Sequence, residues 1–206
     1  MSDKFYVVWR GRVPGVYATW EEARAQVEGF ANARYRAFKV KDRAQAEAAF
    51  AAGPEADLDA LALDWRRQHL PAEVLQGYAV DAAWNAQTKR MHYRAVQVAT
   101  GQEVFHRGPF EDATNNVGEF LAVVEGLDWL KQRNLKVVIY TDSLNAIQWV
   151  SERRCNTTLA PTARNAELFA RIAWAERWLR EHPDHPPVRK WQTEHWGENP
   201  ADFGRK

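Results

Sequence analysis

Residues 114–143 read TNNVGEFLAVVEGLDWLKQRNLKVVIYTDS and predict a helix followed by a buried strand. In the first part, apolar residues recur at helical spacing and form one stripe: Val117, Phe120, Leu121, Val124, Leu127 and Leu130. Residues 137–140, Val-Val-Ile-Tyr, are continuously apolar, which is typical of a parallel strand covered on both faces. The stretch therefore favours an α/β fold.

Two carboxylates of this stretch are candidates for a functional site of such a sheet. Asp142 directly follows the predicted strand, and ligands of parallel sheets bind beyond the carboxyl ends of the strands. Glu119 lies off the apolar stripe, in the first turn of the predicted helix. Each residue also has an ordinary interpretation: Glu119 could complement the helix dipole, and Asp142 could cap the helix that starts near Leu144. These two residues alone leave both alternatives open.

The composition is that of a globular protein. Of 206 residues, 46% are hydrophobic and 27% are charged, which excludes an intrinsically disordered chain. Cys155 is the single cysteine, so a reducing compartment is expected. The N-terminus lacks the apolar core of a signal peptide and no stretch is suited to span a membrane, so we expect a cytoplasmic protein without membrane contact.

The first fifty-three residues predict a small α/β module. Strands are expected at residues 4–10, 16–19 and 33–40, with helices at 21–29 and 43–52. The first helix should begin with a capping box, because Thr19 is followed three residues later by Glu22.

Aromatic and basic side chains are interleaved in this module. Trp20 and Tyr35 stand near Arg36, and the first fifty residues carry nine Lys or Arg against six Asp or Glu. Flat rings beside basic groups suit sugar stacking combined with phosphate contact. The alternative is that the rings form the core of the module itself. The net charge of the whole chain, +1, argues against a broadly basic nucleic-acid binder, so any such affinity should reside here or in local patches.

Residues 54–72 are interpreted as a linker. They shift in composition, are bounded by Gly-Pro and Leu-Pro pairs, and allow a helical turn or two around residues 58–65, which could instead dock on the next domain. Residues 73–206 then predict a mixed α/β sheet flanked by helices. Its strands are expected at residues 75–84, 90–99, 102–110, 137–140 and 188–194, and its helices at 114–132, 143–153 and 163–182.

Two further carboxylates join Glu119 and Asp142 as candidates. Asp81 interrupts an apolar strand, and a lone buried Asp is costly unless it is paired, hydrogen-bonded or bound to metal. Asp202 lies in a Gly- and Pro-containing loop near the C-terminus. Carboxylates that are brought together raise one another's pKa, and divalent cations resolve the repulsion. Two such ions can clamp both oxygens of a phosphoryl displacement.

The residues around these carboxylates resemble the catalytic domain of type 1 ribonucleases H. The matching motifs are AVDAAWN around Asp81, TNNVGEFLAVVEGL around Glu119, YTDSLNAIQWV around Asp142 and WGENPAD around Asp202. Residues 5–38, FYVVWRGRVPGVYATWEEARAQVEGFANARYRAF, resemble the hybrid-binding domain found at the N-terminus of many such enzymes. The resemblance therefore covers most of the chain. It implies a hybrid-binding domain at 1–53, a linker at 54–72 and a catalytic domain at 73–206.

The resemblance implies a ribonuclease H-like mixed sheet, with three antiparallel strands plus parallel strands, preceded by a small three-stranded module. It implies an endonuclease that hydrolyses the RNA strand of RNA–DNA hybrids with two Mg²⁺ ions, or Mn²⁺, leaving 5′-phosphate and 3′-hydroxyl ends. Asp81 would bridge both ions and Asp142 would hold the ion that activates water. Asp202 would hold the ion on the leaving side, and Glu119 would serve that ion and touch the RNA 2′-hydroxyl.

The substrate contacts also follow from the resemblance. In the catalytic domain, Asn115 and Asn116 match minor-groove positions and Lys190 matches a position near the scissile bond. A pocket for a DNA phosphate matches Thr114, Asn116, Thr157 and Thr158. In the N-terminal module, Trp20 and Tyr35 match positions that contact deoxyriboses and Arg36 matches a phosphate contact. No protein partner is implied.

The chain departs from the family pattern at Glu198, and two alternative functions are considered. Glu198 stands where many members of the family carry a His that aids product departure; His195 lies nearby, and Glu198 is favoured. A non-catalytic binder of RNA–DNA hybrid or double-stranded RNA with the same fold is one alternative, which the complete set of four acids disfavours. A resolvase- or integrase-like DNA enzyme is the other, and the N-terminal module disfavours it.

Overall fold

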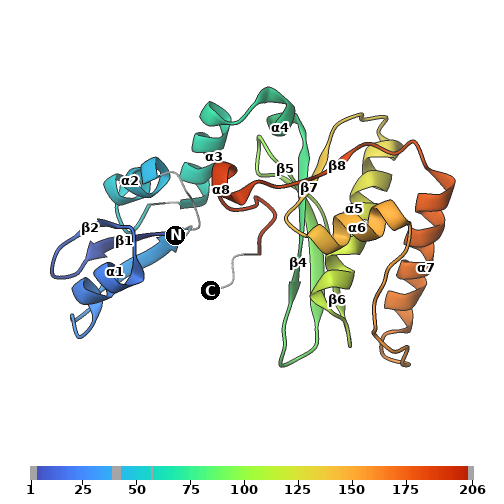
Figure 1. Cartoon of the computed structure of the whole chain (residues 1–206), viewed down its shortest axis with the longest axis horizontal. Coiled ribbons are helices and arrows are strands. Elements are labelled where there is room, and N and C mark those ends of the chain that lie inside the picture. Colours follow the sequence, from blue (N-terminus) through green and yellow to red (C-terminus); the bar gives the residue numbers. More distant parts are fainter. Residues whose placement is uncertain (1–3, 39–42, 57, 204–206) are drawn as a thin grey trace. The chain divides into compact units, whose positions relative to one another are not determined.

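The computed structural model describes residues 4–38, 43–56 and 58–203 (Figure 1). It divides into two compact units. Unit 1 holds the described residues up to Leu70 together with Gln192–Glu198, and unit 2 holds Pro71–Trp191 together with the described residues from Asn199 onward. Among the described residues, no helix combines the length and the apolar character needed to cross a bilayer. The functional division into 1–53, 54–72 and 73–206 stays a prediction.

Unit 1 is built on a three-stranded antiparallel sheet in the order β2-β1-β3. Val7 and Val8, adjacent on β1, are both fully buried because both faces of the strand are covered. Val8 packs with Ala23 and Val27 of α1, and Trp9 donates its indole N–H to the carbonyl of Ala49 in α2 at 3.0 Å. The elements are β1 (Phe5–Arg10), β2 (Gly15–Tyr17), α1 (Trp20–Val27), β3 (Arg34–Phe38), α2 (Arg43–Ala52), α3 (Leu58–His69) and α8 (Thr193–Trp196).

The predicted capping box is confirmed, while the segment that follows α2 is more helical than predicted. The Thr19 hydroxyl accepts from the Glu22 backbone, the Glu22 carboxylate accepts from the Thr19 backbone, and Trp20 becomes the first residue of α1. Helix α3 extends to His69 rather than stopping near residue 65. Between Pro54 and Pro71 the chain contains no Gly or Pro, so nothing in that stretch interrupts the helix.

Unit 2 is built on a five-stranded mixed sheet in the order β6-β5-β4-β7-β8. Strands β4, β5 and β6 are antiparallel, whereas β7 and β8 add parallel pairs, so the predicted fold class is confirmed. The elements are α4 (Ala72–Gln76), β4 (Tyr78–Trp84), β5 (Met91–Gln97), β6 (Glu103–Phe110), α5 (Asn115–Gln132), β7 (Ile139–Thr141), α6 (Leu144–Glu152), α7 (Ala166–Glu181) and β8 (Val188–Lys190).

Some predicted boundaries are wrong. The strand expected at 188–194 ends at Lys190, where the Trp191 backbone donates to the carbonyl of Thr141 and the chain then enters α8. Strand β7 begins at Ile139 rather than at residue 137, and residues 75 and 76 belong to α4 rather than to β4. These limits depend on pairing between distant strands, which local composition does not specify.

Helix α5 forms the centre of the core of unit 2. Ten of its eighteen residues are buried, so its apolar surface is wider than the single predicted stripe. The reason is that α5 contacts strands β4, β5 and β7 and also contacts helices α6 and α7. Two glycines allow a close approach to the sheet. A Cβ atom at Gly118 would lie 2.8 Å from Cβ of Ala82, and one at Gly126 would lie 3.1 Å from Cδ1 of Ile139.

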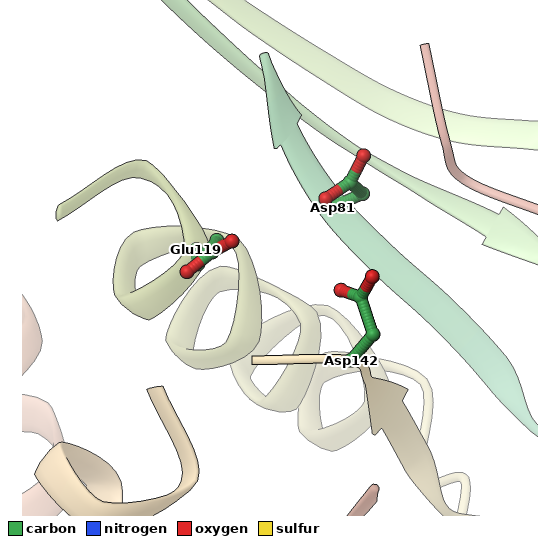
Figure 2. A group of neighbouring side chains, drawn as sticks. All are labelled: Asp81, Glu119 and Asp142. Atoms are coloured by element: carbon green, nitrogen blue, oxygen red, sulfur yellow. The ribbon is translucent and has the colours of Figure 1, made fainter. Parts of the chain in front are cut away.

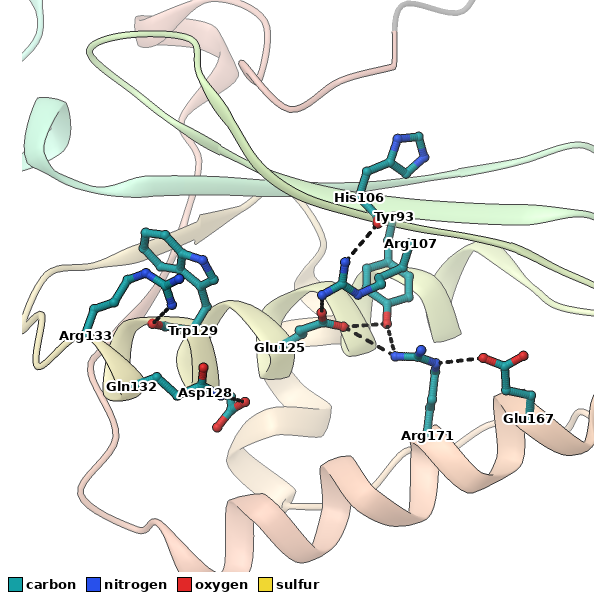
Figure 3. Close-up of polar contacts among 10 residues, drawn as sticks. All are labelled: Tyr93, His106, Arg107, Glu125, Asp128, Trp129, Gln132, Arg133, Glu167 and Arg171. Carbon is teal, nitrogen blue, oxygen red and sulfur yellow. Dashed lines mark hydrogen bonds and ion pairs between the residues drawn. The ribbon is translucent and has the colours of Figure 1, made fainter.

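A partly buried polar network ties α5 to two strands and to α7 (Figure 3). Its centre is Glu125, whose side chain is 12% exposed. The Glu125 carboxylate accepts from the Tyr93 hydroxyl at 2.8 Å and forms ion pairs with Arg107 at 2.6 Å and Arg171 at 3.6 Å. Burial and the adjacent Glu125 charge raise the pKa of Tyr93, so the phenol stays protonated and donates.

We expect Glu125→Ala to lower the free energy of unfolding by roughly 1–3 kcal/mol, because two guanidinium groups and a buried phenol lose their shared acceptor. Glu167→Ala is the matched control: it also removes an ion pair with Arg171, but its own side chain is 72% exposed. The control should cost about 0–1 kcal/mol. Urea denaturation monitored by circular dichroism measures both variants. Equal effects of the two substitutions would show that the network does not stabilise unit 2.

Candidate active site

Strand β4 places Asp81 at the centre of the sheet of unit 2. Its neighbours Val80 and Ala82 are buried in the core, and in register Asp81 lies opposite Arg94 of β5. Strand β7 runs parallel to β4 on its other side, pairing Tyr140 with Ala79. Asp81 is therefore presented between the antiparallel and the parallel halves of the sheet.

Helix α5 presents Glu119 one turn after its start. Thr114 is the N-cap, although its side chain makes no capping hydrogen bond. Asn115, the first helical residue, donates its side-chain amide to the Glu119 carboxylate at 2.7 Å, which is the contact that spacing of four residues allows. The side-chain oxygen of Asn115 is buried without a hydrogen-bond partner. Asn116, next along the helix, is exposed.

Asp142 follows the last residue of β7 and is exposed. The alternative that it caps the next helix is wrong, because Ser143 is the N-cap of α6 and accepts from the backbone of Ala146 at 3.1 Å. The Thr141 hydroxyl accepts from the Ser143 backbone and fixes the turn at 3.2 Å. Lys190 of β8 donates to the carbonyl oxygen of Asp142 at 3.0 Å. Thr141 and Lys190 thus hold the turn, and the Asp142 carboxylate is not the cap of the helix.

The three carboxylates of Asp81, Glu119 and Asp142 converge from a strand, a helix and a strand end (Figure 2). One ligand atom from each lies within 4.8 Å of the others. Asp81 is the most buried of the three and Asp142 is exposed, so the group opens from the protein interior toward solvent. Three oxygen ligands of this kind suit a hard divalent cation such as Mg²⁺ or Mn²⁺.

The electrostatics of the group favour a cation. Burial is the largest cause that raises the pKa of Asp81, the charge of Asp142 is the next, and together with other neighbours they bring it to about 8. The charges of Asp202 and Glu119 act in the same direction, and only the backbone N–H of Ala82 opposes them. Asp81 therefore holds a proton at neutral pH until positive charge arrives. The residues fit a metal ion on both geometry and charge.

The fourth predicted carboxylate, Asp202, lies outside the group of three. It sits in an irregular loop of unit 2, and its charge is close enough to raise the pKa of Asp81. Glu198 and His195 fall within the segment Gln192–Glu198 of unit 1, so their part in this site stays a prediction.

Two residues that were not singled out from the sequence anchor the loop of Asp202, one from strand β5 and one within the loop itself. Arg94 donates to its backbone, and the buried side chain of Asn199 donates to the carbonyl of Val80. An Asn followed by Pro in a loop is a turn signal, and it could have drawn attention to Asn199. Nothing local marks Arg94, because its contact joins residues 107 positions apart.

Of the remaining substrate-contact candidates of unit 2, Thr114 and Asn116 lie at the start of α5, whereas Thr157 and Thr158 lie in the irregular segment after α6. Thr157 follows α6, where its hydroxyl accepts from the backbone of Leu159, and Thr158 beside it is exposed. The phosphate pocket expected from Thr114, Asn116, Thr157 and Thr158 stays a prediction.

In unit 1, three aromatic rings pack against one another in tilted orientations. The ring centroids of Tyr6 and Trp20 are 5.5 Å apart, and those of Trp20 and Tyr35 are 5.6 Å apart. Trp20 packs against the small core of Val8, Ala23 and Val27, whereas Tyr35 is 48% exposed. Arg36, the next residue on β3, is exposed too. The core interpretation thus applies to part of Trp20, while Tyr35 and Arg36 are presented to solvent.

Comparison with known proteins gives two family matches. The sequence model described as RNase H matches residues 77–184, and the one described as Ribonuclease H1 N-terminal domain matches residues 4–50. Among individual proteins, Ribonuclease H1 of Homo sapiens is 49% identical over 51 residues, which is 25% of this chain and 18% of that protein. Ribonuclease H of Crithidia fasciculata is 44% identical over 46 residues, 22% of this chain and 9% of that protein. These alignments thus span less than a fifth of either relative.

Solved structures show a distant likeness. RNase H1 from the halophilic archaeon Halobacterium salinarum NRC-1 is 17% identical, with a TM-score of 0.35, and the match covers 56% of this chain and 83% of that one. LC11-RNase H1 in complex with an RNA/DNA hybrid is 16% identical, with a TM-score of 0.36 and coverage of 56% and 83%. Scores of this size do not bear on function. The RNase H match at 77–184 covers just over half of the 206 residues and contains the three converging carboxylates. The chain therefore belongs to the RNase H family.

Proposed function

We propose that the protein is a divalent-metal-dependent endonuclease that hydrolyses the RNA strand of RNA–DNA hybrids. The observation that carries the proposal is the convergence of Asp81, Glu119 and Asp142 within 4.8 Å, inside the part of the chain that matches the RNase H family. Family membership supplies the reaction class, and the carboxylates supply oxygen ligands in a region where like charges repel.

Asp81, Glu119, Asp142 and Asp202 would hold two Mg²⁺ ions, with Mn²⁺ as a substitute. When bound, such ions activate a water and stabilise the leaving oxygen of the phosphodiester, which yields 5′-phosphate and 3′-hydroxyl ends. Asp81 would give up its proton as positive charge arrives. Asn115 would hold Glu119 in place through the 2.7 Å hydrogen bond, and Lys190 would hold the backbone of Asp142.

Substrate contact is divided between the two units in this proposal. In unit 2, Asn115 and Asn116 at the start of α5 would face the minor groove, where 2′-hydroxyls distinguish RNA from DNA. In unit 1, Trp20 and Tyr35 would stack on deoxyriboses, and Arg36 would contact phosphate. Glu198 is proposed to aid product departure. Single-turnover and steady-state rates of Glu198→Gln would separate that role from metal ligation, because only a departure role spares the first cleavage.

Removing the exposed carboxylate should abolish cleavage. We expect Asp142→Asn to lose hybrid cleavage in saturating Mg²⁺, because a metal ligand is gone, while hybrid binding survives on the contacts of unit 1. The control Asp184→Asn changes another exposed Asp and should cleave like the wild type. The assay incubates full-length protein with labelled RNA–DNA hybrid, double-stranded DNA and double-stranded RNA, in Mg²⁺ or in EDTA. Cleavage by Asp142→Asn at the wild-type rate would contradict the proposed role of Asp142 as a metal ligand. A wild type that binds hybrid but never cleaves it would favour the non-catalytic alternative.

Without divalent ions, stability should depend on the protonation of Asp81. Its folded-state pKa of about 8 exceeds the ordinary value of 3.8, so the folded state binds this proton more tightly than the unfolded state. The free energy of unfolding should therefore fall as pH rises from about 4 to about 8. Asp81→Asn keeps the shape without the charge. Its stability should match the wild type below this window and exceed it by a few kcal/mol above it, at about 1.4 kcal/mol per pKa unit.

Denaturation curves in EDTA across that pH range measure the difference, and added Mg²⁺ should stabilise the wild type much more than Asp81→Asn. An Asp81→Asn protein that is less stable than the wild type at high pH would contradict the proposed charge repulsion. Asp184→Asn again serves as the control, because its side chain is exposed and distant in sequence from the group.

Tyr35, the exposed member of the three aromatic rings, should contribute to affinity and not to chemistry. We expect Tyr35→Ala to weaken hybrid binding by roughly 5- to 150-fold, because loss of one stacking ring costs about 1–3 kcal/mol. The cleavage rate at saturating hybrid should stay unchanged, since no carboxylate of the site lies in this strand. Val13→Ala, at another exposed apolar residue of unit 1, is the control. Fluorescence anisotropy and single-turnover kinetics give the two quantities. Unchanged binding by Tyr35→Ala would remove the ring from the proposed interface.

A further inference from the structure

We propose that Arg94 is a positioning residue that clamps the loop Asn199–Phe203 and so holds the Asp202 carboxylate next to Asp81. This inference rests on the proposed function, in which Asp202 is the fourth metal ligand. Three sets of contacts within unit 2 carry it.

The first set is the pair of hydrogen bonds from the Arg94 guanidinium. Nε donates to the carbonyl oxygen of Ala201 at 2.8 Å, and Nη2 donates to the carbonyl oxygen of Asp202 at 2.6 Å. The planar fork of a guanidinium can hold two successive carbonyls in one orientation, whereas a Lys ammonium cannot. Because the loop contains no regular helix or strand, its backbone geometry depends on such partners.

The second set fixes Arg94 itself and covers the end of the loop. Nη1 of Arg94 donates to the Glu103 carboxylate at 3.3 Å, and the Arg94 side chain is only 24% exposed. Its guanidinium carbon lies 4.6 Å from the centroid of the Phe203 ring, in cation–π geometry. The ring of His106 also contacts the Phe203 ring, in edge-to-face geometry with 5.5 Å between the centroids. Arg94 therefore contacts three successive residues of the loop: Ala201, Asp202 and Phe203.

The third set explains why the clamp delivers Asp202 to the site. Arg94 and Asp81 are direct partners in the antiparallel pair of β5 and β4, so their side chains leave the same face of the sheet side by side. Asn199, 4% exposed, donates to the carbonyl of Val80, the residue before Asp81, and its own side-chain oxygen accepts from the Ala201 backbone. The loop is thus held at two points close to Asp81: by Arg94, which pairs with Asp81 across the strands, and by the carbonyl of Val80, which precedes Asp81. Consistent with this placement, the charge of Asp202 contributes to the raised pKa of Asp81.

The hydrogen-bond partners of Arg94 indicate that it positions the loop and does not neutralise the charge of the carboxylates. Its donors are aimed at backbone carbonyls and at Glu103, so the guanidinium orders the loop and leaves the carboxylates to a divalent cation. Removal of residues that orient metal ligands typically costs 10- to 100-fold in metal affinity or activity. We therefore expect Arg94→Ala to weaken Mn²⁺ binding by about tenfold or more.

The experiment uses the full-length protein and two readouts. Mn²⁺ affinity is measured by electron paramagnetic resonance, and amide hydrogen exchange of Ala201 and Asp202 is measured without metal. Arg94→Ala should weaken Mn²⁺ and speed exchange at both amides, whereas cleavage should recover at high Mn²⁺. Arg94→Lys keeps the charge but loses the fork, and it should show most of the same loss. Arg107→Ala is the matched control, because it removes a partly exposed strand Arg and an ion pair without touching the loop.

A double-mutant comparison separates positioning from a general structural effect. If Arg94 acts through Asp202, then Arg94→Ala should weaken Mn²⁺ no further in an Asp202→Asn background. Additive losses, full activity of Arg94→Lys, or unchanged exchange at Ala201 and Asp202 would each overturn the proposal. Failure of the proposed function looks different: the wild type would not cleave hybrid at all, whereas the exchange readout would still report whether Arg94 holds the loop.

Discussion

The close approach of helix α5 to the sheet is the constraint on which the candidate site depends. Gly118 lets the helix backbone come so near that an added Cβ would lie 2.8 Å from Cβ of Ala82 and 2.6 Å from Sδ of Met91. Gly118 precedes Glu119, and Ala82 follows Asp81. The same contact that packs the core therefore brings the two carboxylates together. Val80 and Ile139 close the next part of this interface against Gly126, which keeps β7 and the turn of Asp142 in position.

This packing concentrates negative charge at a cost to the protein. One carboxylate oxygen from each of Asp81, Glu119 and Asp142 lies within 4.8 Å of the other two. Burial and the repulsion between these carboxylates together raise the pKa of Asp81. Such an arrangement lowers stability unless a proton or a cation compensates it. In the proposed function, part of the binding energy of a divalent cation would be used to deprotonate Asp81 and to bring the carboxylates together in their charged form. The network around Glu125, on the same helix, is fully paired and shows how the same residue type behaves when it only supports the fold.

The two units offer different kinds of contact. Unit 2 holds the carboxylates on rigid elements, whereas the loop that carries Asp202 is irregular and takes its order from Arg94 and Asn199. Unit 1 offers an exposed ring and an exposed Arg on β3. In the proposed function these contacts match the two strands of a hybrid, because the RNA strand presents 2′-hydroxyls and the DNA strand presents deoxyriboses.

Local sequence patterns are sufficient to predict the fold class and the main candidate carboxylates. The apolar period of residues 117–130, the β-branched run before Asp142 and the isolated Asp81 in an apolar strand all reflect local rules, because burial dictates residue type position by position. The sequence also allowed the wrong alternative of Asp142 as a helix cap, since two adjacent polar residues suit that role equally well, and only the backbone showed that Ser143 performs it. Which carboxylates lie together, and which residues contact the loop of Asp202, depends on contacts between residues far apart in the chain. Arg94 and Asp202 are 108 residues apart, and their contact follows from strand register and chain return, which no local pattern encodes.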